Sequence, residues 1–338
     1  MYKIGMYGGS FNPLHLGHVN NIITAANQCE KLYLVLSTTH DPIEIDECIR
    51  RQWLTKITAD LDNVSIITTH NNIDSKNSTS YDWKIEAEHI LQQTGAPFDV
   101  VFAGDDYREV GIWERLYPDS KIIYLSRKEV PISSTQIRQH PFKYYDYLPR
   151  VVQNYYKKKV CIVGAESCGK TVLTRNLAKY FNTTHVEEIG RYLCLDLGGI
   201  DNMQKSDYVD ILLQHKQAER KALQSAHKVL FVDTEALVTL FFYRYSFPQN
   251  DDYNQKFFQL ATSIAQINDY DLYIFLEPDV KFVDDGARTQ ITKTARQTSN
   301  RQLKQLLKDN HIQYVTISGD YQTRYTKAKK EVEKLLAS

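Results

Sequence analysis

Two histidines near the N-terminus have the spacing of a phosphate-binding device. His15 and His18 stand three residues apart with Gly17 between them, and they follow a Gly-Gly turn at Gly8 and Gly9. At the start of a helix, the positive end of the helix dipole would add to the two imidazoles. Both rings can donate hydrogen bonds to phosphate oxygens as negative charge builds during displacement at phosphorus. We therefore predict an anion site here.

A second phosphate-binding pattern follows about a domain's length later in the chain. The hydroxyls of Ser133, Ser134 and Thr135, with the first-turn amides of a helix, would hold a triphosphate. Arg138, one turn onward, adds positive charge. Alone, this pattern is also that of an ordinary helix cap. Paired with the two histidines it becomes specific, because both segments bind phosphate.

The run from Gly164 to Thr171 matches the P-loop pattern of Gly, four residues and Gly-Lys-Ser/Thr. Backbone N–H groups that wrap a polyphosphate need glycines where a Cβ would block close approach. Lys170 would neutralise the β- and γ-phosphates, and the Thr171 hydroxyl would ligate Mg²⁺. The predicted ATP contacts of this half are Gly164, Glu166, Ser167, Cys168, Gly169, Lys170, Thr171 and Val172.

Carboxylates at two strand ends favour a small-molecule kinase. Asp233 ends an apolar run in the manner of a Walker-B strand, where it would bind Mg²⁺ directly or through water. Glu187, Glu188 and Arg191 follow a short strand whose end would face the phosphate acceptor. The sequence does not decide which carboxylate, Glu187, Glu188 or Asp233, acts as the general base of the kinase. An ordinary strand-end aspartate and a solvated acidic turn are the alternatives.

A basic segment after the strand at 272–276 resembles a lid. Asp285 and Arg288 lie in it, and it continues through Arg296 to Arg301, rich in Thr, Gln and Ser. We predict that its arginines close over the transferring phosphate charge. An exposed loop is the alternative interpretation.

These residues must be held at strand ends, and the chain twice shows an apolar strand, a Gly-rich turn and a helix. Strands that alternate with helices imply parallel sheets covered on both faces. We predict an α/β protein with two doubly wound parallel-sheet domains. The expected strands are Tyr2–Tyr7, Leu32–Ser37, Val64–Thr68, Val100–Ala103, Lys121–Leu125, Val160–Val163, Val229–Val232, Leu272–Leu276 and Tyr314–Ile317. Helices are expected from near His18, over Lys170–Tyr180, and in Tyr208–Ser225 and Arg301–Lys308.

The second strand and its loop place a domain boundary near Tyr156. The length of 338 residues suits two domains, here residues 1–156 and 157–338. The aromatic and basic stretch 141–159 is expected to be a helical connector. Lys157–Lys159 suit a solvated interdomain surface better than a phosphate patch.

The composition excludes several classes of protein. Lys plus Arg and Asp plus Glu both number 41, so no global field would attract nucleic acid or an anionic membrane. No apolar run approaches about 18 residues, which predicts no membrane insertion. The cysteines show no paired ligand spacing and suit a reducing cytoplasm; they are Cys29, Cys48, Cys161, Cys168 and Cys194. We expect a cytoplasmic protein.

The two phosphate signatures of the first half together resemble the HxGH nucleotidyltransferase superfamily, which has a Rossmann-like fold. An HxGH half, the connector at 141–149 and a P-loop half resemble, in that order, the bacterial bifunctional NadR type. This family joins a nicotinamide-nucleotide adenylyltransferase to a ribosylnicotinamide kinase. The resemblance spans nearly the whole chain, including Glu188–Arg191, Phe231–Thr234 and Val283–Arg288. Some members begin with a helix-turn-helix domain, whereas this chain opens with the strand at Tyr2, so DNA binding by that route is not expected.

The resemblance implies two reactions. The second domain would phosphorylate the ribose 5′-hydroxyl of nicotinamide riboside with ATP and Mg²⁺, giving nicotinamide mononucleotide (NMN). The phosphate of NMN would then attack the α-phosphorus of a second ATP in the first domain, giving NAD and pyrophosphate. The expected partners are therefore ATP, nicotinamide riboside, NMN and NAD, with no nucleic acid. A homo-oligomer of unspecified size and a functional link to a riboside permease are further expectations.

The resemblance also suggests roles for particular residues. In the first domain, ATP contacts are expected from Gly8, Gly9, Ser10, Phe11, His15, His18, Ser133, Ser134, Thr135 and Arg138, and NMN contacts from Arg50, Arg51, Trp53, Gly104 and Asp105. Trp53 would stack on nicotinamide, although core packing is equally compatible with its sequence; Trp83 and Trp113 leave the same choice. The catalytic set is expected to be His15, His18, Lys170, Asp233 and Glu188, with Thr171 and Asp233 at the metal. Riboside and lid contacts are expected from Glu187, Glu188, Arg191, Asp285, Arg288 and Arg301.

Two other functions are compatible with the motifs. The first is an HxGH enzyme for another acceptor, such as pantetheine phosphate or a cytidylyl acceptor, fused to a different kinase. The second is a regulatory protein that binds ATP or NAD and has lost turnover in one half. Motif chemistry alone specifies ATP and a phosphate or hydroxyl acceptor.

Overall fold

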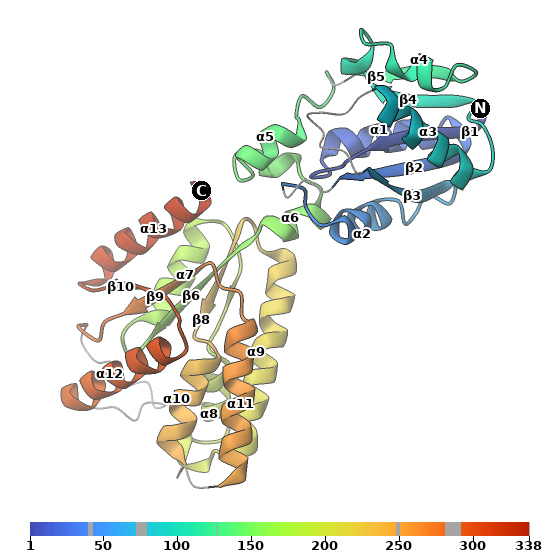
Figure 1. Ribbon diagram of the computed structural model, residues 1–338. Coiled ribbons are helices and arrows are strands. Elements are labelled where there is room, and N and C mark those ends of the chain that lie inside the picture. Colours follow the sequence, from blue (N-terminus) through green and yellow to red (C-terminus); the bar gives the residue numbers. More distant parts are fainter. Residues whose placement is uncertain (40–42, 72–79, 127, 248–250, 281–291, 338) are drawn as a thin grey trace. The chain divides into compact units, whose positions relative to one another are not determined.

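The computed structural model describes residues 1–39, 43–71, 80–126, 128–247, 251–280 and 292–337. The chain divides into two compact units, Met1–Tyr156 and Lys157–Ser338. Each unit is built on a five-stranded parallel sheet with helices around it (Figure 1). The predicted fold class is thereby confirmed. Asp285 and Arg288 of the predicted lid lie outside the described residues.

The sheet of the first unit has the strand order β3-β2-β1-β4-β5. Its strands are β1 (Tyr2–Gly9), β2 (Cys29–Thr39), β3 (Val64–Asn71), β4 (Val100–Gly104) and β5 (Lys121–Leu125). The order reverses between β1 and β4, which pair in parallel with Gly5 opposite Val100. At such a reversal the connecting segments diverge to opposite faces, and a crevice forms beyond the carboxyl ends of the strands. Both phosphate motifs of this unit lie at that edge.

Helices cover both faces of the first sheet because its strands are apolar on both sides. The helices are α1 (Leu16–Ala26), α2 (Glu47–Ile57), α3 (Ser80–Thr94), α4 (Ile112–Leu116), α5 (Ser134–Gln139) and α6 (Arg150–Tyr156), with short 3₁₀ turns at Asp105–Tyr107 and Tyr145–Tyr147. Helix α1 buries Ile22 and Ala25 on one face. On the other face, Ala87 and Ile90 of α3 join Met6 and Val35 of the strands in one apolar cluster.

The sheet of the second unit has the order β10-β9-β6-β8-β7. Its strands are β6 (Lys158–Gly164), β7 (His185–Val186), β8 (Val229–Asp233), β9 (Leu272–Leu276) and β10 (Val315–Ile317). The P-loop strand β6 is central, between β8 and β9, so the loop that follows it starts from the most enclosed part of the sheet. Asp233 at the end of β8 lies beside Ile162 of β6.

Two apolar layers enclose the second sheet. The helices are α7 (Lys170–Tyr180), α8 (Ile189–Asp196), α9 (Lys205–Ser225), α10 (Ala236–Ser246), α11 (Asp252–Ile267), α12 (Lys293–Asp309) and α13 (Tyr321–Ala337), with a 3₁₀ turn at Ile200–Asn202. Alternate β6 residues point to opposite layers, as the two-residue strand period requires. Val160 and Ile162 pack with α7 and α13, whereas Cys161 and Val163 pack with α8 to α12.

The lysines at the start of the second unit are engaged within that unit. Lys157 is buried and donates to the carbonyls of Leu223 and Gln224 at the end of α9, at 2.7 and 3.3 Å. Lys158 forms an ion pair of 2.8 Å with Asp271. These contacts argue against the phosphate patch that the sequence left open.

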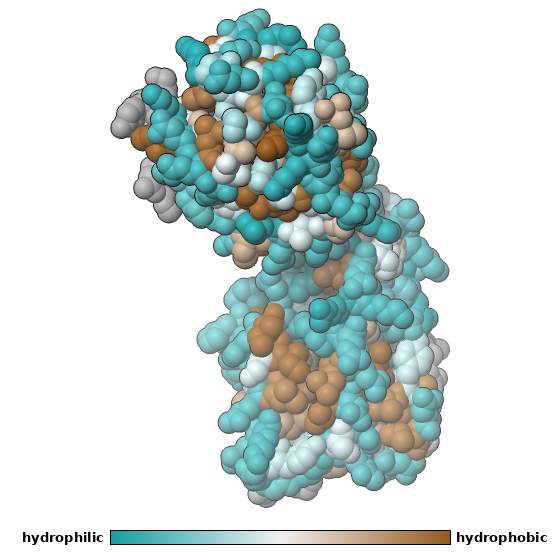
Figure 2. Space-filling model, turned by 90° about the vertical axis from the view of Figure 1, so that its right-hand side faces the viewer, coloured by the Kyte–Doolittle hydropathy of each residue, from teal (hydrophilic) through white to brown (hydrophobic). Residues whose placement is uncertain are grey.

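The surface of the second unit includes an apolar area on the side that carries α9 and α11 (Figure 2). Leu213, Tyr245, Phe258 and Ile267 are among the exposed large side chains of α9, α10 and α11. Within the described residues, no helix has both the length and the apolar character needed to cross a bilayer.

Candidate functional sites

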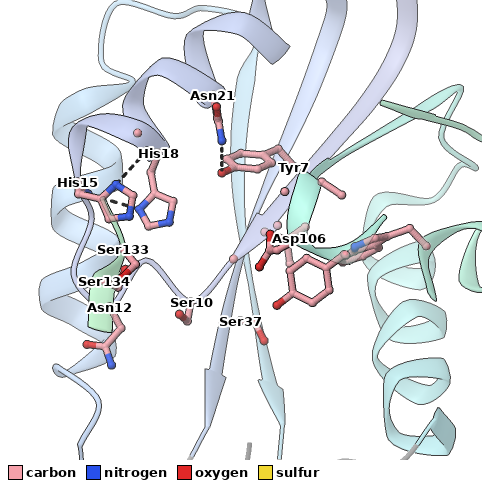
Figure 3. Close-up of a pocket in the computed structure, with 18 of the residues that line it drawn as sticks. Tyr7, Ser10, Asn12, His15, His18, Asn21, Ser37, Asp106, Ser133 and Ser134 are labelled. Carbon is pink, nitrogen blue, oxygen red and sulfur yellow. Dashed lines mark hydrogen bonds between the residues drawn. The ribbon is translucent and has the colours of Figure 1, made fainter. Parts of the chain in front are cut away.

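His15 and His18 cap the N-terminus of helix α1. His15 is the N-cap residue of α1, and its Nδ1 accepts a long hydrogen bond of 3.4 Å from the His18 backbone N–H. The Nδ1 of His18 accepts the backbone N–H of His15 at the same distance. The two rings are stacked, with centroids 3.7 Å apart (Figure 3). A neutral imidazole that accepts through Nδ1 carries its proton on Nε2, so this arrangement assigns an Nε2–H donor to each ring.

Neighbouring residues hold the histidine pair in place. A Cβ on Gly17 would stand 3.1 Å from two atoms of the His15 ring, which explains the glycine between the histidines. Phe11 is fully buried and packs its ring edge-to-face against His18 at 5.1 Å. Phe11 does not line the adjoining cavity, so it supports His18 rather than lying where a nucleotide would contact it.

The second phosphate motif is tied to the histidine loop by hydrogen bonds. Ser134 donates to the carbonyl of Pro13 at 3.0 Å, and Arg138 donates to the carbonyl of Asn12. Ser133 caps α5 in a reciprocal pair with Gln136. The two motifs are thus one assembly, although more than 110 residues separate them in the sequence.

A cavity of about 700 Å³ lies at the carboxyl ends of β1, β2 and β4. The predicted ATP-contacting residues that line it are Gly8, Gly9, Ser10, His15, His18, Ser133, Ser134, Thr135 and Arg138. Figure 3 shows His15, His18, Ser133 and Ser134 on one side of the strand ends and Asp106 on the other. Gly104 also lines the cavity, whereas Asp105 does not and Asp106 does.

Part of the cavity lining is aromatic. Trp83 of α3 meets Trp113 of α4 edge-to-face at 6.0 Å, and Tyr117 stacks on Trp113 at 6.3 Å. All three line the cavity, as do Tyr107 and the carboxylate-bearing Glu86. The sequence left Trp83 and Trp113 undecided between packing and ligand contact; the structure places both at the cavity.

Three residues expected at NMN lie elsewhere. Arg50 is buried, pairs with Glu44 at 2.8 Å and donates to the Ser10 carbonyl at 2.7 Å, so it braces the loop after β1. Trp53 is buried and packs edge-to-face on Tyr155 of α6 at 5.6 Å, which is the core-packing alternative. Arg51 is exposed and donates to Thr68 at 2.8 Å. None of the three lines the cavity.

The P-loop of the second unit has the backbone of an anion-binding nest. Ser167 and Gly169 both have positive φ, at 55° and 85°, and helix α7 begins directly afterwards. Such alternation turns successive N–H groups towards one point. Lys170 is buried, and its ammonium group donates to the Ala165 carbonyl across the loop at 3.2 Å. Val172 is exposed on α7, so it does not belong to the cradle.

Thr171 and Asp233 form a pair suited to magnesium. The Thr171 hydroxyl donates to Asp233 Oδ2 at 2.5 Å. The other carboxylate oxygen, Oδ1, is buried with no hydrogen-bond partner among the described residues. Burial, and next the charge of Glu188, raise the pKa of Asp233 from 3.8 to about 6. Hydroxyl and carboxylate oxygens are ligands that Mg²⁺ prefers, and bound cationic charge would favour the ionised form, so these residues fit the ion.

A smaller cavity of about 80 Å³ adjoins the P-loop. Its polar lining includes Glu166, Lys170, Glu188, Arg191 and His215. Its apolar lining includes Ile200, Met203, Tyr208, Ile211 and Phe242. A hydroxyl-bearing acceptor with an apolar portion would suit such a lining.

Glu187 and Glu188 have different environments. Glu187 is bound by Arg175 at 2.7 Å and by the Tyr192 hydroxyl, and it does not line the small cavity. Partial burial alone would raise the pKa of Glu187, but hydrogen bonds from Tyr192 and Arg175 lower it below its ordinary value. Glu188 does line the cavity. The geometry therefore favours Glu188 over Glu187 as the residue that meets the acceptor.

The P-loop is held by two arginines that donate to its backbone carbonyls. The sequence did not mark either of them as a P-loop contact. Arg296 of α12 donates to the Ser167 carbonyl at 3.2 Å, and Arg324 of α13 donates to the Cys168 carbonyl. Arg296 had been assigned to a lid, but it is buried on a helix. Arg301, also assigned to the lid, is exposed on α12 and contacts Thr298 at 3.4 Å.

Comparison with known proteins agrees with this division of the chain. Residues 6–140 match the cytidylyltransferase-like family and residues 159–324 match the AAA domain family. The trifunctional NAD biosynthesis/regulator protein NadR of Escherichia coli (strain K12) is 28% identical over 348 residues, covering 98% of this chain and 83% of the relative. The Salmonella typhimurium protein of the same name is also 28% identical, over 99% of this chain and 83% of its own length.

The chain is also similar in fold to a solved structure. A crystal structure of NadR protein in complex with NR has a TM-score of 0.79 at 22% identity, covering 100% of this chain and 97% of that one. The likeness at this identity is one of fold. Over nearly its whole length the chain is similar to NadR-type proteins, with a cytidylyltransferase-like first unit and an AAA second unit.

The chain is a NadR-like NAD biosynthesis protein with a nucleotidyltransferase unit and a kinase-like unit. The first unit alone is also similar to the phosphopantetheine adenylyltransferase of Mycoplasma mycoides subsp. mycoides, at 27% identity over 41% of this chain and 97% of that protein. The homo-oligomer and the link to a riboside permease stay predictions.

Proposed function

We propose that the chain phosphorylates nicotinamide riboside to NMN in its second unit and adenylylates NMN to NAD in its first. The observation that supports this proposal is that, in each unit, a Gly-containing loop that leads into a helix borders a cavity. The relatives' names and the ligand NR in one related structure support the choice of substrates.

In the first unit, the NMN phosphate attacks the α-phosphorus of ATP and pyrophosphate leaves. We assign the Nε2–H groups of His15 and His18 to the phosphate oxygens on which charge accumulates. Ser134 and Arg138, tied to the histidine loop through Pro13 and Asn12, would position the leaving pyrophosphate. Donors already fixed in place stabilise a transition state without having to reorganise.

In the second unit, Lys170 would swing from Ala165 to the β- and γ-phosphates once ATP enters the P-loop. We assign Glu188 to the riboside 5′-hydroxyl, which it orients and whose proton it accepts. Thr171 and Asp233 would hold the metal. Magnesium, when bound there with ATP, supplies charge neutralisation for the transferring phosphoryl group.

The proposal is tested by supplying purified protein with Mg-ATP and nicotinamide riboside and resolving riboside, NMN and NAD by chromatography. We expect riboside to be consumed, with NMN appearing before NAD. Formation of NMN without NAD, even when NMN is added in excess, would contradict the assignment of the first unit. Untouched riboside in the presence of ATP turnover would contradict the assignment of the second.

Phosphopantetheine is the competing acceptor for the first unit, because phosphopantetheine adenylyltransferases match that unit at 27% identity. The aromatic side of the cavity favours a planar ring over a flexible pantetheine arm. The same assay with phosphopantetheine in place of NMN decides between them, and we expect no dephospho-coenzyme A.

A further inference from the structure

A buried carboxylate is fixed in the wall of the first cavity. Trp83, Glu86, Ala87 and Ile90 have the spacing of one face of helix α3, and all four line the cavity. Glu86 is 9% exposed. Its Oε1 accepts hydrogen bonds of 2.8 Å from the hydroxyls of Ser37 on β2 and Thr69 on β3. These bonds hold the carboxylate at the carboxyl edge of the sheet.

Only one oxygen of Glu86 is used in this way. In the described part of the chain, Oε2 accepts no hydrogen bond and Glu86 forms no ion pair. Oε2 is also not among the fully buried side-chain atoms that lack a partner, so a ligand could reach it. Burying a carboxylate is costly unless its charge and lone pairs are met. A ligand group that donates a hydrogen bond or carries positive charge would satisfy it.

Aromatic rings line the same cavity as this carboxylate. Trp83 stands one helical turn before Glu86 and contacts Trp113 at 6.0 Å. Tyr117 is close as well: burial chiefly, and the Glu86 charge in addition, raise the pKa of Tyr117 above its usual range. Aromatic faces attract flat cationic rings. The group that meets Glu86 is therefore expected to be attached to a planar, positively charged ring.

We propose that Glu86 makes the first unit select a pyridine mononucleotide with an uncharged carboxamide over one with a carboxylate. This inference rests on the adenylyltransferase activity proposed above. A carboxamide N–H₂ can donate to Oε2 while the pyridinium ring lies among the aromatic residues. A carboxylate at the same place has no proton to donate and is repelled by the Glu86 charge.

The test compares kcat/KM for NMN and for nicotinate mononucleotide in the full-length wild type and in Glu86→Gln. Gln keeps an oxygen for Ser37 and Thr69 and replaces the charge with an amide that can donate to a carboxylate. The ratio of the two kcat/KM values within one preparation does not depend on the fraction of active protein. Asp106→Asn, the same chemical change elsewhere in the cavity lining, is the control.

We expect Glu86→Gln to reduce the preference for NMN at least about tenfold, chiefly by lowering KM for nicotinate mononucleotide, and Asp106→Asn to change it less than about threefold. An unchanged ratio in Glu86→Gln, or an equal fall in Asp106→Asn, would overturn the inference. A wild type that prefers nicotinate mononucleotide would overturn the inference and leave the adenylyltransferase standing. A wild type that adenylylates neither nucleotide would show that the proposed function is wrong, and the inference falls with it.

Discussion

The guanidinium group of Arg324 donates a hydrogen bond to the backbone carbonyl of Cys168 in the P-loop. The same side chain donates to the carbonyls of Gly319 and Glu277 at 2.7 Å each and pairs with Asp279. It is 2% exposed. One buried arginine therefore joins the phosphate loop to the segments that follow β9 and β10.

Replacing Arg324 by lysine should impair the kinase reaction selectively. A single ammonium group cannot reproduce the planar fork that reaches several carbonyls at once, so the P-loop would lose its support. We predict that KM for ATP in riboside phosphorylation rises about tenfold, equivalent to about 1.4 kcal/mol. The measurement is the rate of NMN formation against ATP concentration.

Two controls accompany that measurement. Arg220→Lys changes an exposed arginine on α9 and should leave KM for ATP within about twofold of wild type. Arg324→Lys supplied with NMN should still form NAD at the wild-type rate. An equal loss in both activities would indicate general misfolding rather than a role in positioning the P-loop.

Glu235 should make stability depend on pH. Its side chain caps α10 by accepting the Leu237 N–H at 2.9 Å, and it is 1% exposed. Burial raises the pKa of Glu235 from 4.5 to about 7 in the folded protein. The folded state therefore binds this proton more tightly than the unfolded state, and stability present below pH 4.5 is lost as the pH rises towards 7.

Glu235→Gln removes this dependence while keeping the cap acceptor. We predict that the variant gains stability relative to wild type as pH rises from 5 to 8, by at most about 3 kcal/mol. Chemical denaturation at several pH values measures the difference in free energy of unfolding. Asp210→Asn, an exposed change on α9, should give a nearly constant difference. A constant difference for Glu235→Gln as well would contradict the assignment.

Trp53 should matter for stability and not for NMN. Its ring is buried against Tyr155 outside the cavity, so Trp53→Phe removes packing without touching a ligand. We predict a loss of about 1–2 kcal/mol in stability, with KM for NMN within about twofold of wild type. Thermal unfolding and the NMN-dependent reaction are measured on the same preparation. A tenfold rise in KM without loss of stability would restore the stacking interpretation.

The sheets could be predicted because their strands are short apolar runs, and several of these runs end in a glycine-rich turn or a carboxylate. Each expected strand is present, but several are longer than expected: β2 covers Cys29–Thr39 and β3 covers Val64–Asn71. The P-loop and HxGH motifs carry enough local chemistry to be recognised without tertiary information. Helix α10 was not predicted, because Ala236–Ser246 is apolar almost all round and lacks a helical period.

Residues whose role depends on distant partners could not be assigned from the sequence. The bond from Arg324 to Cys168 spans 156 positions, and no local pattern marks either residue as part of it. Arg50 and Trp53 have residue types that suit NMN, but tertiary packing places both in the interior. Glu86 is one acidic residue on an amphipathic helix until Ser37 and Thr69 are seen to bind it.

The central claim is that two separate ATP-dependent reactions occur in the two units of one chain. Lys170→Ala and His18→Ala, each given Mg-ATP with riboside or with NMN, test it most directly. We predict that Lys170→Ala leaves riboside unchanged but converts added NMN to NAD, whereas His18→Ala converts riboside to NMN and stops there. If either folded variant loses both reactions, or if Lys170→Ala still phosphorylates riboside, the division of activities between the units is wrong.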